Sequence, residues 1–183
     1  RLDVLKHACL CIIECMCDDD TLCVISYSTH SKTEFLLSEM TAENKAYASS
    51  AVKGLTANGL TNIWGGLKSS LEITRSYASK EFNILLLTDG DITCGKMDIS
   101  KEYKDFCTEN SVNPKVHTFG LSNEVKSTRL CSLSESSQGC FHFVSDTCML
   151  YTNVVNFISN LSCHCGDVFY DGNHIGPLHI GTT

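Results

Sequence analysis

Short apolar runs alternate with longer segments of helical periodicity along most of this sequence. The clearest runs are Leu22–Ile25 and Ile84–Leu87, which are apolar at every position. Continuous runs of this kind suit strands that are buried on both faces. Strands that alternate with helices form mostly parallel sheets covered by helices. The sequence therefore predicts a doubly wound α/β fold, with a mostly parallel sheet flanked by helices.

The periodicity also sets the expected element boundaries. Apolar residues three and four positions apart mark helices, and Thr41 is the expected N-cap of the second helix. We expect strands at 21–27, 33–37, 82–88, 115–120 and 140–144, helices at 1–16, 43–55, 63–78, 126–136 and 146–161, and one more helix around Ile99, Tyr103 and Phe106.

The pattern changes after residue 161, which divides the chain in two. Residues 1–161 are predicted to form one α/β domain. Residues 162–183 are predicted to begin a β-rich segment, with short strands at 168–170 and 178–180 joined by Gly-Asn turn chemistry. The first residues form no signal peptide and contain no start Met. We therefore expect the chain to be a fragment whose true beginning lies upstream.

The charge and hydropathy of the chain exclude some classes of partner. Its 183 residues carry a net charge of -7 without a basic stretch. Such a chain is a poor electrostatic match to nucleic-acid phosphates. No apolar run approaches the ~18 residues that a membrane-spanning helix needs. Composition thus argues against nucleic-acid binding and against membrane insertion.

The twelve cysteines bear on the cellular compartment. Most of them lie inside apolar helix or strand patterns, where free cysteine behaves as a small hydrophobic residue. This placement favours a reducing, intracellular and cytoplasmic setting. Secretion with several disulfides is the alternative, and Asn160-Leu161-Ser162 matches a glycosylation sequon.

Two predicted loops carry candidate ligand groups. Thr61 and Asn62 stand just before a predicted helix, and Asp89 and Asp91 follow the strongest predicted strand. Ligands of doubly wound sheets bind outside the carboxyl ends of the strands, and hydroxyl and carboxylate oxygens suit Mg²⁺. In the alternative, these residues have structural roles only: Thr61 or Asn62 caps the helix, and Asp89-Gly90 turns the chain after the strand.

These segments resemble the von Willebrand factor A-type domain family. The segment Leu60-Thr61-Asn62-Ile63-Trp64-Gly65-Gly66-Leu67 is similar to the family's Gly-Gly-Thr-Asn-Ile-x-x-Gly-Leu loop. Leu85–Gly90 resembles its strand ending in Thr-Asp-Gly, and Leu22–Ser28 resembles its Val-Ser-Phe-Ser strand. The resemblance covers roughly residues 1–161 and implies a non-enzymatic, protein-binding α/β module.

The resemblance also implies a metal-ion-dependent adhesion site that holds Mg²⁺ or Mn²⁺. Thr61 would be a direct metal ligand and Asp89 would act mainly through water, with Asn62 and Asp91 as candidate rim residues. An acidic side chain of the protein partner would complete the metal shell. The family's Asp-x-Ser-x-Ser motif on the first strand is missing from this chain. We therefore expect a domain that lacks its first strand and a fragment that binds the metal weakly or not at all.

A second hypothesis comes from a different class of protein. Asp89-Gly90-Asp91-Ile92-Thr93 also matches Asp-x-Asp-x-Thr, which resembles the haloacid dehalogenase-like phosphatases. There Asp89 would be the nucleophile and Asp91 the general acid/base of a Mg²⁺-dependent reaction. Two strands and three helices precede Asp89, whereas that family places its nucleophile on the first core strand.

Other metal-ligating residues give weaker signals. Cys163-His164-Cys165 could suggest zinc, but its spacing matches no common structural zinc pattern. Cys9 and Cys11 stand two positions apart on a predicted helix, so their side chains point apart and favour packing over ligation. His117 and His142 lie on predicted strands, where we expect hydrogen-bonded core or edge histidines.

Overall fold

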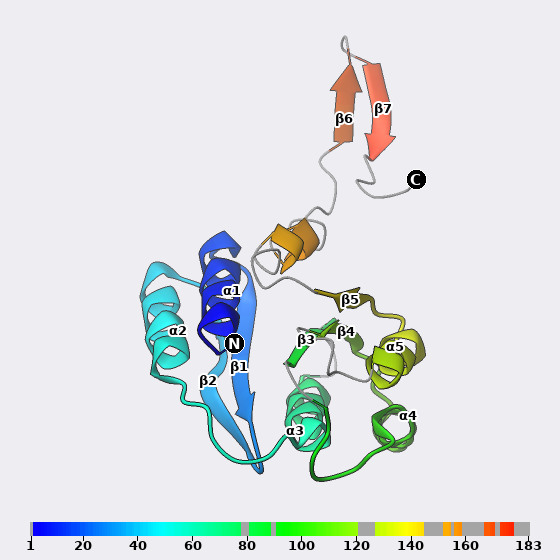
Figure 1. The fold of residues 1–183 in the computed structure, drawn as a ribbon. Coiled ribbons are helices and arrows are strands. Elements are labelled where there is room, and N and C mark those ends of the chain that lie inside the picture. Colours follow the sequence, from blue (N-terminus) through cyan, green and yellow to red (C-terminus); the bar gives the residue numbers. More distant parts are fainter. Residues whose placement is uncertain are drawn as a thin grey trace.

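The computed structural model describes residues 2–77, 81–88, 91–120, 127–144, 152–154, 156–158, 167–170 and 173–177. Helices and strands alternate along most of this length, as the apolar pattern predicts (Figure 1). The elements are α1 (Leu2–Cys15), β1 (Thr21–Tyr27), β2 (Ser31–Glu39), α2 (Ala42–Gly54), α3 (Ile63–Ser76), β3 (Asn83–Thr88), α4 (Ile99–Asn110), β4 (Lys115–Gly120), α5 (Ser127–Ser136), β5 (Phe141–Phe143), β6 (Asp167–Tyr170) and β7 (Asn173–Pro177). Residues 152–154 and 156–158 are also helical.

A three-stranded parallel sheet forms the centre of the fold. Its order is β3-β4-β5, with Asn83 opposite Lys115 and Thr88 opposite Gly120. Strand β5 continues the sheet, with Phe143 opposite Gly120. The carboxyl ends of the three strands therefore meet at one edge. The prediction of a parallel sheet flanked by helices is confirmed for this part of the chain.

Strands β1 and β2 form a separate antiparallel pair. Directly paired strands lie about 4.8 Å apart and are joined through their backbones. In the part of the chain that the structure describes, no such ladder joins β1 to β3. A side chain links them instead, because the Tyr27 hydroxyl donates to the Leu87 carbonyl at 2.8 Å. The expected continuous sheet is thus divided between β1 and β3.

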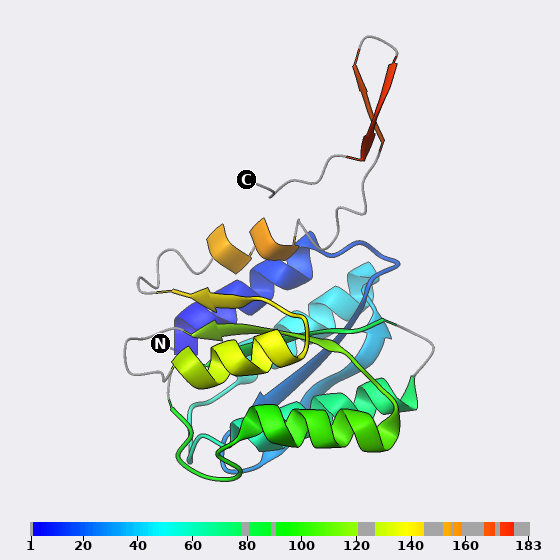
Figure 2. The ribbon, with the colours of Figure 1, turned by 90° about the vertical axis from the view of Figure 1, so that its right-hand side faces the viewer.

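Helices cover both faces of these sheets. Figures 1 and 2 show α3 and α4 on one side, and α1 with helical residues 152–158 on the other. Alternate residues of β3 face the two layers, as the period of two in a strand requires. Leu86 belongs to the cluster with α3 and α4, and Leu85 and Leu87 pack in the cluster with α1.

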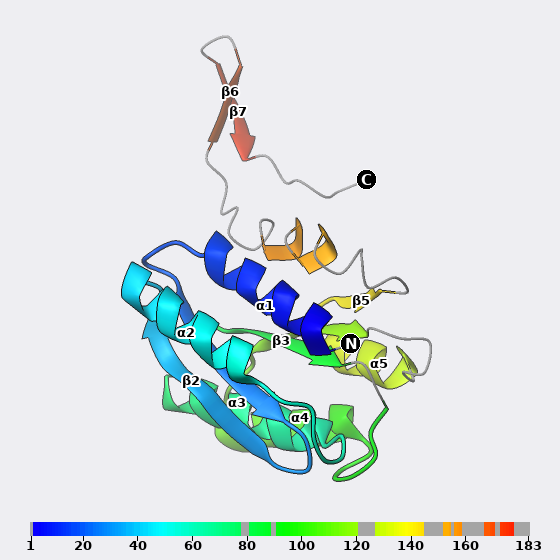
Figure 3. The same cartoon turned by 60° about the vertical axis from the view of Figure 1, so that its left-hand side comes forward.

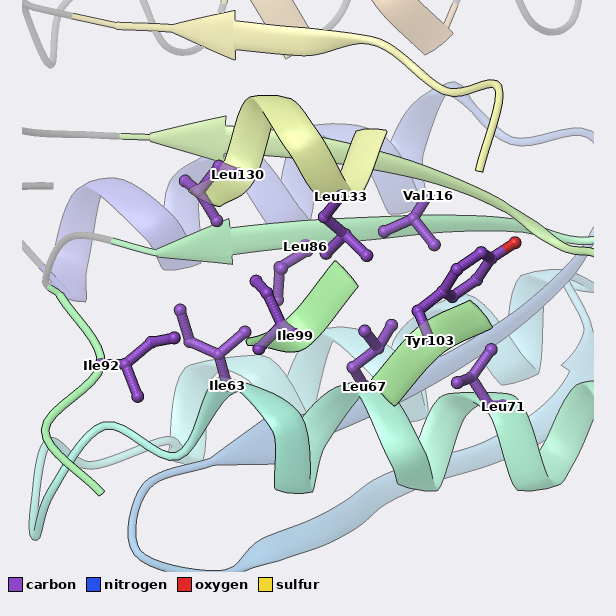
Figure 4. Close-up of a cluster of buried hydrophobic side chains, with 10 residues drawn as sticks. All are labelled: Ile63, Leu67, Leu71, Leu86, Ile92, Ile99, Tyr103, Val116, Leu130 and Leu133. Carbon is purple, nitrogen blue, oxygen red and sulfur yellow. The ribbon is translucent and has the colours of Figure 1, made fainter. Parts of the chain in front are cut away.

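The larger cluster fills the space between α3, α4, α5 and the parallel sheet (Figure 4). All its central residues are at most 6% exposed: Ile63, Leu67, Leu71, Leu86, Ile92, Ile99, Tyr103, Val116, Leu130 and Leu133. Tyr103 is polar at its tip, and its hydroxyl donates to the Pro114 carbonyl at 2.7 Å. Burial raises the pKa of Tyr103, so this hydroxyl stays protonated and keeps its hydrogen bond.

The opposite side is covered by two smaller clusters. One joins Ala8 and Ile12 of α1 to Phe119 of β4 and to Val154 and Phe157. The other places α1 and α2 over the β1–β2 pair (Figure 3) and is built on Ile13, Met40, Ala48 and Val52. Helix α1 therefore contributes to both clusters and connects the two parts of the sheet on this side.

The helix starts follow local capping chemistry. Thr41 caps α2, because its hydroxyl accepts from the Asn44 amide at 3.4 Å. Asp98 caps α4 in the same way, through the Lys101 amide at 3.1 Å. Such caps satisfy amide groups that have no partner inside the helix. The predicted role of Thr41 is confirmed.

Three sequence predictions differ from the structure. Strand β2 covers Ser31–Glu39 instead of 33–37, because its backbone pairs with β1 along the full length. The apolar residues of β1 are only partly buried, although a strand buried on both faces was predicted. In the terminal segment β7 is Asn173–Pro177 and pairs with β6, whereas the predicted strand at 178–180 lies outside the described residues.

We expect Leu71→Ala to destabilise the domain by about 2–5 kcal/mol. Leu71 is 0% exposed in the larger cluster, so truncation leaves a cavity. Urea unfolding measures the loss. The matched control is Leu36→Ala, because Leu36 is 74% exposed and its truncation should cost less than about 1 kcal/mol. Equal losses for both variants would contradict this placement of the core.

Candidate functional site

The candidate site lies where β1 and β3 end. The backbone amide of Asn62, just before α3, donates to the Ser28 carbonyl at 2.8 Å. The carbonyl of Thr61 accepts from the amides of Thr93 and Cys94 at 3.1 and 3.4 Å. The loop before α3 is therefore attached both to the end of β1 and to the segment that follows β3. This is the edge at which ligands of parallel α/β sheets bind.

Gly59 sets the course of this loop. Its φ is +71°, in the left-handed region that favours glycine. A Cβ atom at this position would lie 2.7 Å from the Thr29 hydroxyl oxygen, which itself accepts from the Leu60 amide at 3.1 Å. The loop can approach the end of β1 this closely because residue 59 has no side chain.

Thr61 is held firmly through its backbone. Its amide donates to the Thr93 hydroxyl at 2.7 Å, in addition to the carbonyl contacts with Thr93 and Cys94. Within the described residues no hydrogen bond engages the Thr61 hydroxyl itself. The side chain is partly buried. Thr61 therefore presents a positioned hydroxyl oxygen that can accept or donate to a ligand.

Asn62 has a structural role at the same place. Its side-chain oxygen accepts from the Gly65 amide at 2.9 Å and caps α3. Its side-chain nitrogen donates to the Thr29 carbonyl at 3.2 Å. Both ends of the amide are thus used within the fold, as the structural alternative expected. A rim role for Asn62 stays a prediction.

Asp91 lies beside this loop in an ion pair. Its carboxylate accepts from Arg129 of α5 at 3.0 Å and from the Ile92 amide at 2.9 Å. The two side chains are 27% and 30% exposed, so water screens the pair and its net contribution is about 0–1 kcal/mol. The Arg129 charge makes this carboxylate a weaker attractor for a cation than an isolated aspartate.

The other predicted ligand, Asp89, lies outside the described residues, as does Gly90. The structure places its neighbour Thr88 at the end of β3, where it is 3% exposed. Of the next described residues, Thr93 and Cys94 contact Thr61, and Asp91 stands two positions before Thr93. Thr61, Thr93 and the end of β3 are thus brought to one edge, with Asp91 close to it in the chain, and the placement of Asp89 stays a prediction.

The described residues do not by themselves make a magnesium site. They contain no group of three His, Cys, Asp or Glu side chains placed to hold a metal ion. Thr61 supplies one oxygen, and Asp91 is engaged by Arg129. Because Mg²⁺ requires nearly ideal octahedral geometry, one hydroxyl and retained water would hold it weakly.

Three residues of this edge were missed by the sequence reasoning. Ser28 and Thr29 fix the loop from β1, and Thr93 fixes Thr61 from the other side. Ser28 and Thr29 directly follow a predicted strand and Thr93 follows the Asp-Gly turn. Small hydroxyl residues at strand ends are the signal that could have found them.

The cysteines form no cluster at this edge. All nine described cysteines are free thiols: Cys9, Cys11, Cys15, Cys17, Cys23, Cys94, Cys107, Cys131 and Cys140. Burial raises the pKa of Cys9 to about 11, and burial also raises the pKa of Cys11. Both thiols are therefore poorly ionised and suited to packing. The predicted zinc motif at 163–165 lies outside the described residues.

Comparison with known sequences assigns the family. Residues 12–156 match the model of the von Willebrand factor type A domain. An uncharacterized protein from Synechocystis sp. is 27% identical over 146 residues, which cover 79% of this chain and 34% of that protein. The chain thus spans about a third of the length of this curated relative. No described helix is long and apolar enough to cross a membrane.

Solved structures share the fold at low sequence identity. A von Willebrand factor type A protein from Catenulispora acidiphila gives a TM-score of 0.80 at 18% identity, covering 87% of this chain and 38% of that one. Proximal thread matrix protein 1 from the mussel byssus, with a zinc-occupied MIDAS motif, gives 0.70 at 18% identity, covering 88% and 43%. An aerotolerance-related membrane protein from Bacteroides fragilis gives 0.66 at 13% identity, covering 87% and 88%.

We expect Gly59→Ala to destabilise the domain by about 1–2 kcal/mol, the cost of a left-handed conformation for a residue with a Cβ. The matched control is Gly54→Ala. Gly54 ends α2 with nothing within 4 Å of an added Cβ, so alanine should be neutral or stabilise by up to about 1 kcal/mol. Urea unfolding of both variants checks the pair. A shift of the same sign and size in both would refute the backbone argument.

Proposed function

Because this chain belongs to the von Willebrand factor type A family, we propose that it is a non-catalytic module that binds a protein partner at the edge carrying Thr61. Domains of this family are usually binding modules that often carry a metal-ion-dependent adhesion site. The observation that carries the proposal is the Thr61 hydroxyl. The backbone amide and carbonyl of Thr61 are held by Thr93 and Cys94, while no hydrogen bond to a described residue engages its side-chain hydroxyl.

The proposed cofactor is Mg²⁺ or Mn²⁺ in the intact parent protein. Thr61 would provide a direct oxygen ligand and Asp89 a carboxylate acting mainly through water. An acidic side chain of the partner would complete the shell, so the metal supplies attraction for that carboxylate. The oxygens of this chain alone are too few for a tight site, and metal binding by the fragment should be weak or absent.

We place one additional strand between β1 and β3, carrying the family's Asp-x-Ser-x-Ser motif. Three observations support it. The two strands end at the same edge, no backbone ladder joins them among the described residues, and the apolar residues of β1 are only partly buried. A strand there would pair with both neighbours, bury their apolar side chains and bring three more oxygen groups to the Thr61 edge.

The rim of this edge is apolar as well as polar. Leu60 is 52% exposed and Met97 is 49% exposed. Gly95 lies against Asn62, which brings the segment around Met97 close to the Thr61 loop. Exposed apolar side chains beside a charged anchor are typical of protein-binding surfaces. The proposed partner therefore combines an acidic side chain with an apolar contact.

The intracellular, cytoplasmic setting of the parent remains a proposal that rests on the cysteine placement. Six of the nine described cysteines are at most partly exposed. Five of them lie inside helices or strands, namely Cys9, Cys11, Cys23, Cys107 and Cys131, and Cys94 lies in the loop beside Thr61. Secretion is the alternative, and it would bring some of the twelve cysteines into disulfides.

The phosphatase hypothesis loses its support. Helices α1, α2 and α3 and strands β1 and β2 all precede β3, so Asp89 does not follow the first strand. The carboxylate of the proposed general acid/base, Asp91, is already engaged by Arg129 of α5. Hydrolysis of a generic phosphate ester that is abolished by Asp89→Asn would restore this hypothesis.

The test begins with the transcript upstream of Arg1. If it encodes an apolar strand ending in Asp-x-Ser-x-Ser, the extended chain should bind Mn²⁺ in calorimetric titration and melt at a higher temperature than the present chain. Changes of groups outside the direct ligands already weaken metal sites by about 10–100-fold, so Thr61→Val should weaken Mn²⁺ binding at least about tenfold.

Thr56→Val is the matched control, because Thr56 is an exposed threonine of the same loop. It should leave Mn²⁺ binding unchanged. The metal-dependent mechanism would be rejected if the upstream sequence lacks the oxygen ligands or if the extended chain does not bind Mn²⁺. The domain would then be a metal-independent scaffold. Equal melting temperatures for the two chains would reject the additional strand.

A further inference from the structure

Two histidines lie beneath the last helical segment of the domain, on the side of the sheet opposite α3 and α4. His117 of β4 is 3% exposed, and its ring centre lies 4.5 Å from that of Phe157. His142 of β5 lies 5.2 Å from Phe157 and stacks on Phe119 at 4.7 Å. Phe157, from helical residues 156–158, is 8% exposed and therefore closes this aromatic cluster.

The hydrogen bonds of His117 require a neutral ring. Its Nδ1 accepts from the backbone amide of Cys140 at 3.1 Å, so this nitrogen carries no proton. Its Nε2 lies 3.1 Å from the Asn83 side-chain oxygen, to which it donates. A second proton has to go on Nδ1. Protonation would therefore turn the contact with Cys140 into two facing donors.

His142 was predicted to be a hydrogen-bonded core or edge histidine, but one of its ring nitrogens lacks a hydrogen bond. Its Nε2 is buried and has no hydrogen-bond partner among the described residues. A buried polar nitrogen without a partner costs free energy even when neutral, and a charged imidazolium would cost more. The folded arrangement therefore tolerates this side chain only in its neutral form.

Among the described residues, no opposite charge appears as a cause of the lowered pKa of either histidine. The pKa of His117 is lowered to about 4, chiefly by burial and in addition by the positive charge that His142 and Lys115 bring nearby. Burial also lowers the pKa of His142. The described residues of the covering segment carry no charge: Thr152, Asn153, Val154, Asn156, Phe157 and Ile158. Helix α1 meets the cluster with Val4, Leu5, Ala8 and Ile12, and the titratable residues on this helix are Asp3, Lys6, His7, Cys9, Cys11, Glu14 and Cys15.

We propose that His117 and His142 form a pH-sensitive latch, in which protonation releases helical residues 152–154 and 156–158 from the sheet. Release exposes both imidazoles to water and removes the aromatic cover of Phe157. The neutral pair keeps the segment docked. The latch thus makes the attachment of the last helix depend on pH, independently of any metal or partner.

The direction follows from the pKa values of the docked and released states. The released state binds protons near the ordinary value of 6.5, and the docked state holds the pKa of His117 at about 4. Docking is therefore complete above about pH 6.5 and weakens as the pH falls toward 4. Between pH 7.5 and 5.0, the equilibrium constant for release should rise by up to about 25-fold from His117 alone.

Hydrogen exchange of the whole chain at several pH values tests the latch, with rates divided by the intrinsic rate at each pH. Protection of residues 152–158 should fall by at least about tenfold between pH 7.5 and 5.0. Helix α4 lies on the other face of the sheet and serves as the internal reference, so its protection should stay constant.

Two variants separate the latch from general acid sensitivity. His142→Phe keeps the stacked ring and removes the buried nitrogen, so it should raise protection of residues 152–158 and flatten part of the pH response. The double variant H117Q/H142F should lose most of the pH response. His30→Gln is the control, because His30 is exposed in the β1–β2 turn, and it should respond like the original chain.

Three results would overturn the proposal. The first is a pH-independent protection of residues 152–158 in the original chain, whether high or low. The second is a double variant that keeps the full response. The third is an equal loss of protection in α4, which would mean that acid unfolds the whole domain and not this segment.

Discussion

The fold depends on the burial of β3 between two helical layers. Leu86 packs against α3 and α4, while Leu85 and Leu87 pack against α1, so a single six-residue strand joins both cores. At about 25 cal/mol per Å² of apolar surface removed from water, this two-sided burial supplies much of the stabilisation of a small domain. The same burial leaves β3 little freedom to shift along its own axis, so Thr88 at its end is held at a defined place.

The position of the candidate site is a consequence of this constraint. The segment after β3 returns to the Thr61 loop and holds it through Thr93 and Cys94, while the end of β1 holds the same loop through Ser28 and Thr29. The loop thus bridges two strands that no backbone ladder joins among the described residues. Tyr27, this loop and the shared packing of α1 relate β1 to β3, and an additional strand between them would complete the sheet and the ligand set together.

Much of the fold could be predicted from the sequence, because apolar runs and capping residues are local signals. The apolar run before Ser28 gave β1 its bounds, and the hydroxyl of Thr41 marked the start of α2. The ion pair between Asp91 and Arg129 could not be predicted, because it joins residues 38 positions apart whose meeting depends on how α5 lies on the sheet. The incomplete burial of β1 and the unsatisfied nitrogen of His142 were missed for the same reason, since each depends on which elements pack against a strand and not on the strand's own residues.

The recognition edge and the histidine cluster share the parallel sheet but depend on different contacts. The loop carrying Thr61 is anchored by β1 and by residues 93–94, and neither lies beneath helical residues 152–158. The histidines are held by Asn83, Cys140 and the aromatic rings of Phe119 and Phe157. Release of the last helix by acid would therefore leave the anchors of the Thr61 loop in place. Binding at the edge and attachment of the helix can change separately, because the loop is fixed through backbone hydrogen bonds that no histidine proton touches.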